Sequence, residues 1–114
     1  MTSPRFSCGL EAVLDLVGGK WKLLILFHLK GGRKRFGELK RALGSVSMKM
    51  LSQQLKEMAS DGLVRRIDFQ TVPPHVEYEM TELGQDLGRA VMPLCRWGSS
   101  RMDEIIAISR RRVA

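Results

Sequence analysis

Apolar residues recur with a helical period through the first third of the chain. In residues 9–17, 20–30 and 36–43 they fall three and four positions apart, which is typical of amphipathic helices. Glycines follow each stretch, and Gly44 suits a C-terminal cap because glycine accepts a positive φ. The pattern therefore predicts three short helices separated by glycine turns.

A fourth helix and a hairpin are expected next. Ser47 is a good N-cap for a helix that continues to about Ser60, because its hydroxyl oxygen can accept a free backbone N–H of the first turn. Residues 63–69 and 76–80 have the β-branched and aromatic content of strands. Two consecutive prolines lie between them and cannot sit inside a sheet ladder. The two strands are therefore expected to form a hairpin with a stiff, protruding loop.

Helical spacing returns from Thr81, which can cap the helix that follows. Pro93 is expected to bend this helix unless a new helix begins there. A last helix is predicted from about Ser100 to Arg111. One apolar face of the helix after Thr81 holds Leu83, Leu87, Ala90, Val91 and Leu94.

This order of elements predicts a winged helix-turn-helix of the mainly α (α+β) class. A short helix, a turn of three or four residues and a second capped helix make the helix-turn-helix, and the hairpin after it makes the wing. We expect a single domain over residues 1–114. Within it the helix-turn-helix covers about 36–60 and the two-stranded wing about 63–80. The terminal helices, about 9–17 and 82–111, have apolar faces that exceed what this core can cover, so they are expected to dimerise.

The helix expected after Ser47 has two different faces. At about 100° per residue its apolar side chains cluster within about 80° and should face the core, whereas a polar group clusters in a similar arc more than about 90° away. Every polar member can donate to a phosphate or a base edge, and none is acidic. The apolar face holds Met48, Leu51, Leu55 and Met58, and the polar face holds Lys49, Ser52, Gln53 and Lys56.

The charge of the chain is strongly basic and unevenly distributed. Nineteen Lys and Arg stand against twelve Asp and Glu, a net charge of +7. Residues 1–60 hold eleven basic and four acidic side chains, and residues 61–114 hold eight of each. Such a surface indicates a nucleic acid or an anionic membrane as partner. The alternative is a solvated face that happens to be basic.

The sequence favours DNA over a membrane. No apolar run approaches the ~20 residues needed to cross a bilayer. The first residues also lack the apolar stretch and cleavage site of a signal peptide, so we expect a cytoplasmic protein. Double-stranded DNA is the expected partner, with no membrane association.

Neither catalysis nor a bound metal or cofactor is expected. The chain has no glycine-rich phosphate loop, no nucleophile elbow and no grouped acid and base. Its two cysteines and two histidines lie far apart, without the spacing of a metal site. We therefore expect a binding protein and not an enzyme.

Four blocks of the chain resemble the HxlR-type (MarR/HxlR-like) winged helix-turn-helix transcriptional regulators. They are GGKWKLLILFHL (18–29), RFGELKRAL (35–43), SVSMKMLSQQLKEMASDGLV (45–64) and VPPHVEYEMTELG (72–84). The resemblance implies a homodimer whose terminal helices dimerise and whose two recognition helices bind a pseudo-palindromic operator. The DNA-contacting positions that it implies are Arg35, Lys40, Ser47, Lys49, Ser52, Gln53 and Lys56. The wing adds His75, where the family commonly has Arg.

Cys8 is the candidate redox or effector site. It directly precedes the first helix, and Arg5 is close enough in sequence to favour the reactive thiolate. Several members of the resembling family use an N-terminal cysteine as a switch, so a small electrophile or oxidant is an expected partner. Gly9 follows Cys8 where the family commonly has Pro. The alternative is an incidental thiol on a frayed terminus, while Cys95 is expected to be buried and inert.

Two other functions remain open at this point. The chain could be an architectural protein that binds DNA without regard to sequence, or a winged helix whose basic face binds an acidic protein. The wing adds one expectation for all three functions. Glu77 and Glu79 share a strand face and would repel phosphate, so each should pair with Arg65 or Arg66 across the hairpin. Only the loop tip, Thr71 to His75, should approach DNA.

Overall fold

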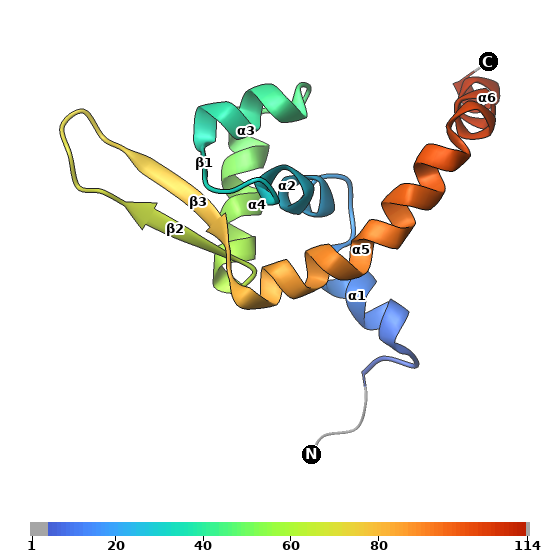
Figure 1. Ribbon diagram of the computed structural model, residues 1–114, viewed down its shortest axis with the longest axis horizontal. Coiled ribbons are helices and arrows are strands. Elements are labelled where there is room, and N and C mark those ends of the chain that lie inside the picture. Colours follow the sequence, from blue (N-terminus) through green and yellow to red (C-terminus); the bar gives the residue numbers. More distant parts are fainter. Residues whose placement is uncertain (1–4, 114) are drawn as a thin grey trace.

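The computed structural model describes residues 5–113 and confirms the mainly helical α+β winged helix-turn-helix (Figure 1). Helices occupy both ends of the chain, and a small sheet lies between them. The elements are α1 (Gly9–Val17), α2 (Lys22–Leu29), β1 (Lys34–Arg35), α3 (Phe36–Leu43), α4 (Met48–Ser60), β2 (Val64–Asp68), β3 (Val76–Met80), α5 (Glu82–Ser100) and α6 (Met102–Val113).

A single apolar core joins the first four helices to the start of β2. Helix α2 is central to it and packs against α3, α4, α5 and β3. No buried polar or charged side chain occurs within residues 5–113, so the core is held by apolar burial. Its members are Val17, Ile25, Leu26, Leu29, Leu39, Val46, Leu51, Leu55, Met58, Leu63 and Val64.

Turn chemistry fixes both ends of α4. Ser47 caps the start as predicted, its Oγ accepting the N–H of Met50 at 3.0 Å. At the other end Gly62 takes a φ of 77°. The Gly62 N–H donates to the Ala59 carbonyl at 3.1 Å and the Leu63 N–H to the Met58 carbonyl at 2.9 Å. This Schellman motif turns the chain directly into β2.

The sheet has three strands, whereas the sequence predicted only two. The order is β1-β3-β2 and both pairings are antiparallel. The additional strand, β1, pairs Lys34 with Tyr78 and Arg35 with Glu77. A segment of two residues is too short to show the alternation of apolar and polar side chains that predicts a strand. It forms a strand because the free edge of β3 supplies partners for its backbone hydrogen bonds.

Helix α5 passes through Pro93 without ending. It starts at the predicted Thr81 cap, whose Oγ1 accepts the Gly84 N–H at 3.1 Å, and it continues to Ser100. The helical path ends at Arg101, with φ −117°, and α6 begins at Met102. The ribbon of α5 changes direction along its length (Figure 1). Pro93 has no N–H, so the helix lacks the hydrogen bond that residue 93 would donate to the Arg89 carbonyl. Arg89 is exposed, so solvent can bond to this carbonyl instead.

The C-terminal helices extend away from the core. Figure 1 shows α5 leaving the sheet and carrying α6 to the far side of the molecule from the wing. Helix α6 contains no buried residue, and α5 buries only Gly84. None of the helices within residues 5–113 is long and apolar enough to cross a bilayer.

Candidate nucleic-acid interface

Helix α4 separates a core face from a donor face, as its sequence predicted. Leu51, Leu55 and Met58 are buried. Met48, expected in the core, is instead 66% exposed. A helical wheel gives the direction of a side chain but not whether a neighbouring element covers it, and Met48 is left uncovered although Val46 and Leu51 on either side of it are buried. Every residue of the donor face is exposed, and the face holds Lys49, Ser52, Gln53 and Lys56.

A carboxylate at the edge of the donor face ties α4 to α2. Lys22 Nζ lies 2.8 Å from Glu57 Oε1, and Gln53 Nε2 donates to Glu57 Oε2 at 3.2 Å. The hydrogen bond from Lys22, and then that from Gln53, lowers the pKa of Glu57. The Gln53 carbonyl oxygen and second amide N–H stay available, and a bidentate pair with adenine uses these two groups.

The sequence interpretation did not identify this network. Gln53 and Glu57 are four positions apart, a spacing at which helical side chains meet, so that half of the network was predictable. Lys22 lies in another helix, and only the packing of α2 against α4 brings its ammonium to Glu57.

The helix before α4 presents two of the expected phosphate contacts. Arg35 is exposed at the start of α3, and its backbone N–H donates to Glu38 Oε1 at 2.8 Å. Glu38, the one acid of residues 30–56, is therefore used to cap α3. Lys40 is half-buried on the same helix. Ser47 uses its oxygen as a cap acceptor, so its hydroxyl proton can still be donated.

Two arginines neutralise Glu79 in the wing. Arg65 Nη1 and Arg33 Nε lie 2.9 Å from its two carboxylate oxygens. The pairing expected across the hairpin is thus confirmed for Glu79, which stands opposite Arg65 in the register. It is wrong for Glu77, which stands opposite Ile67 and accepts a hydrogen bond from His75 at 2.7 Å instead.

His75 lies at the base of the wing loop. Its ring packs on Phe69 at a centroid distance of 4.5 Å, and Nε2 is bonded to Glu77. The exposed tip is formed by residues 71–74, with Val72 99% exposed.

The two cysteines occupy different surroundings. Cys8 is exposed at the N-cap of α1, and Cys95 is half-buried on α5. Arg5 lies 3.7 Å from Asp15 and over the Phe6 ring, so its charge has an acidic partner besides any thiolate. Within residues 5–113 no cluster of three or more potential metal ligands occurs.

The family of the chain follows from a comparison over most of its length. A model of HxlR-like helix-turn-helix proteins matches residues 16–106, which include α2 to α5. The chain belongs to the HxlR-like helix-turn-helix family. It is accordingly a transcriptional regulator and not an enzyme.

Relatives of this HxlR-like regulator include proteins known by sequence and by structure. YtcD of Bacillus subtilis (strain 168), a helix-turn-helix-type transcriptional regulator, is 43% identical over 105 residues, which cover 92% of this chain and 83% of that protein. The redox regulator HypR in its reduced form has a TM-score of 0.82 and 40% identity, covering 88% of this chain and 99% of HypR. Reduced YodB of B. subtilis has a TM-score of 0.70 and 32% identity, covering 82% and 92%.

Proposed function

We propose that this HxlR-like regulator binds double-stranded DNA sequence-specifically, with α4 in the major groove. The observation that supports this proposal most directly is the donor face of α4. Its members, Lys49, Ser52, Gln53 and Lys56, are all exposed, and none of them is acidic. The buried Leu51, Leu55 and Met58 hold the opposite face to the core. An exposed helix face of amides, hydroxyls and cations has the donors that base edges and phosphates accept.

The supporting contacts come from α3 and the wing. Arg35 and Lys40 are cations that can neutralise phosphates beside the groove, while the neutralised Glu79 removes a source of repulsion. The tip at residues 71–74 would follow the DNA backbone, with His75 at its base. The remaining expected contact, Ser47, offers its hydroxyl proton at the N-terminus of α4.

The unit that binds DNA is proposed to be a homodimer. Exposed apolar side chains are concentrated on α1, α5 and α6, outside the core that a single chain forms. Full burial of each such side chain stabilises an interface by about 1.5–3 kcal/mol. We therefore expect a second copy of the chain to bury them. These side chains include Leu10, Leu14, Leu83, Leu94, Trp97, Met102, Ile106 and Ile108.

Selection of bound fragments from random DNA, followed by a salt titration, tests this function. We expect a steep salt dependence on every duplex and a preference of about 10³ or more for the selected site over random DNA. Equal affinity for both would favour an architectural DNA-binding protein. No duplex binding at all would favour a winged helix that contacts an acidic protein.

We further propose that Cys8 regulates DNA binding by reacting with an oxidant or electrophile. HypR, described as a redox regulator in oxidised and reduced forms, and YodB, described in reduced and diamide-treated forms, both share this fold. In this chain Cys8 is exposed and precedes α1, part of the proposed dimer face. A reaction there would alter how two chains meet and thus the spacing of their α4 helices.

Matched cysteine variants test the switch. Diamide takes two electrons and two protons from two thiols as a disulfide forms, whereas methylglyoxal adds a thiol across its aldehyde to give a hemithioacetal. We expect either reagent to lower operator affinity in the wild type and in Cys95→Ser but not in Cys8→Ser. An equal loss in the Cys8→Ser variant would assign the response to another residue.

A further inference from the structure

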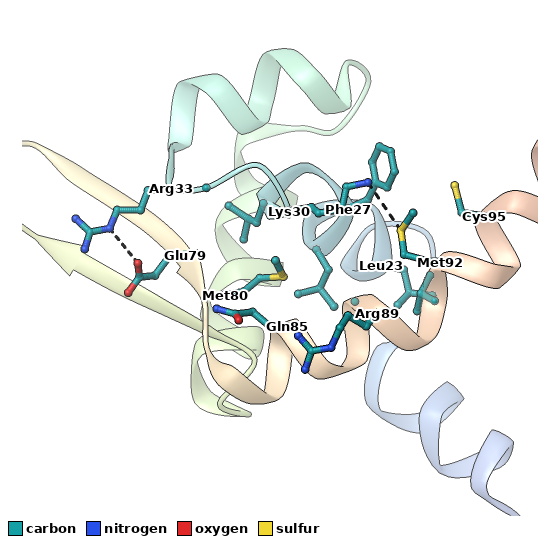
Figure 2. A pocket seen from close by; sticks show the side chains of 15 residues that line it. Leu23, Phe27, Lys30, Arg33, Glu79, Met80, Gln85, Arg89, Met92 and Cys95 are labelled. Carbon is teal, nitrogen blue, oxygen red and sulfur yellow. Dashed lines mark hydrogen bonds and ion pairs between the residues drawn. The ribbon is translucent and has the colours of Figure 1, made fainter.

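A cavity of about 500 Å³ lies between α2, β3 and α5, outside the DNA-facing surface (Figure 2). Its size falls within the range of small-molecule sites, which are mostly apolar with a few polar groups. Its apolar walls come from both helices and from the end of β3. They include Leu23, Leu26, Phe27, Met80, Val91 and Met92.

Lys30 places a cation on this apolar cavity. Its ammonium lies 3.8 Å from the Met92 sulfur and 4.9 Å from the centre of the Phe27 ring. No carboxylate lies within ion-pair distance of it among the residues that the structure describes. A thioether and a ring face compensate an ammonium only weakly, so an anion entering the cavity would gain a charge-assisted hydrogen bond.

The other cations at the cavity already have acidic partners. Arg33 is bonded to Glu79 at 2.9 Å, and Arg89 lies 3.6 Å from Asp86. Gln85 adds an uncharged polar group to the lining. The lining thus combines a broad apolar surface with a single cation that lacks a carboxylate, which favours a ligand with an extended apolar body and one negative charge.

We propose that this cavity binds a small aromatic carboxylate, with the carboxylate at Lys30 and the ring against the apolar walls formed by Leu23, Met80 and Val91. A regulatory consequence rests on the proposed function. Helix α2 belongs to the core that holds α4, and α5 leads to the proposed dimer face, so a ligand between them contacts both parts. The binding itself requires no DNA and can be measured on the protein alone.

Calorimetric titration with 2-naphthoate and its uncharged analogue 2-naphthamide tests the charge requirement. We expect the carboxylate to bind at least tenfold more tightly than the amide. Lys30→Gln should remove this difference, and Lys30→Arg should retain it. Lys20→Gln is the matched control, because the Lys20 ammonium also lies over an aromatic ring, 4.7 Å from the centre of Trp21, but outside the cavity.

Three results would overturn the proposal. The first is equal affinity for the carboxylate and the amide. The second is an equal loss of naphthoate affinity in Lys20→Gln and Lys30→Gln. The third is no binding of either compound because a second copy of the chain fills the cavity. Lys30 is exposed, so its variants should keep the helical circular dichroism of the wild type. The affinity of the protein for its operator is measured separately, with and without naphthoate. An unchanged operator affinity would refute the regulatory consequence and leave the calorimetric result intact.

Discussion

The amide of Gln53 on α4 is anchored by one hydrogen bond. Glu57 accepts one of its N–H groups, while its carbonyl oxygen and second N–H stay available. Gln53→Ala is therefore expected to relax base preference, costing about 1–3 kcal/mol on the selected site with little change on random DNA. Competition binding on both duplexes measures this. An equal loss on both would show that α4 does not place Gln53 against a base.

Arg35 and Lys40 should act differently, because a phosphate contact carries no sequence information. Arg35→Ala and Lys40→Ala are each expected to weaken the selected and random duplexes alike. Each should also reduce the slope of log affinity against log salt concentration by roughly one unit. A salt titration of both variants checks this, and a loss confined to the selected site would contradict the assignment.

Acid should weaken the attachment of α4 to α2. The Lys22 ammonium, and then Gln53, holds the pKa of Glu57 below its ordinary value of 4.5. A carboxyl whose folded pKa is lowered stabilises the fold above its unfolded pKa, and this stabilisation is lost as the pH falls through the folded pKa. Urea midpoints of the wild type should therefore fall more steeply below pH 4.5 than those of Glu57→Gln. Parallel curves for the two proteins would rule out this contribution.

At the scale of the elements, Gly84 lets α5 approach the start of β2. A Cβ there would overlap the carbonyl oxygen of Leu63, a backbone atom that the Thr81 N–H and hydroxyl also bind. Gly84→Ala should destabilise the protein by about 1–3 kcal/mol. Gly88→Ala is the matched control, because its Cβ would meet only the Met80 sulfur at 3.7 Å, and it should stabilise α5 by about 1 kcal/mol.

Chemical denaturation of both glycine variants measures these changes. The opposite signs matter, because the two residues are one helical turn apart on α5. A Gly84→Ala protein as stable as Gly88→Ala would show that α5 is not packed against Leu63 as closely as the structure has it.

The wing is expected to contribute affinity and not base preference. Its acids are paired within the hairpin, and its exposed tip at residues 71–74 carries no charge of its own. Replacing residues 70–74, which lie between the hydrogen-bonded Phe69 and His75, with a two-residue Asn-Gly turn, which hairpins favour, should lower affinity for all duplexes without changing the selected sequence. Repeating the selection from random DNA with this variant checks it. Unchanged affinity would place the tip away from DNA.

Local chemistry made much of this fold predictable. The caps at Ser47 and Thr81 and the face division of α4 depend on residues close together in sequence, and all three follow from side-chain type and spacing. The edge strand β1 and the Lys22–Glu57 pair join segments distant in sequence. Met48 was misplaced for a related reason, since its exposure depends on which parts of α4 the neighbouring elements cover.

At the scale of the whole molecule, charge and apolar exposure occupy different parts of the chain. The net charge of +7 lies entirely within residues 1–60, which include α3 and α4. The helix without buried residues, α6, lies at the far end of the molecule from the wing (Figure 1). A two-fold dimer through the terminal helices would leave both α4 donor faces free to meet successive major grooves.

The footprint of the protein on its selected DNA, together with the number of chains bound, tests this account most directly. We expect two chains on each duplex, protecting two related half-sites whose centres lie one helical turn apart, about 34–36 Å. A footprint over one asymmetric half-site, with a single chain bound to each duplex, would contradict it.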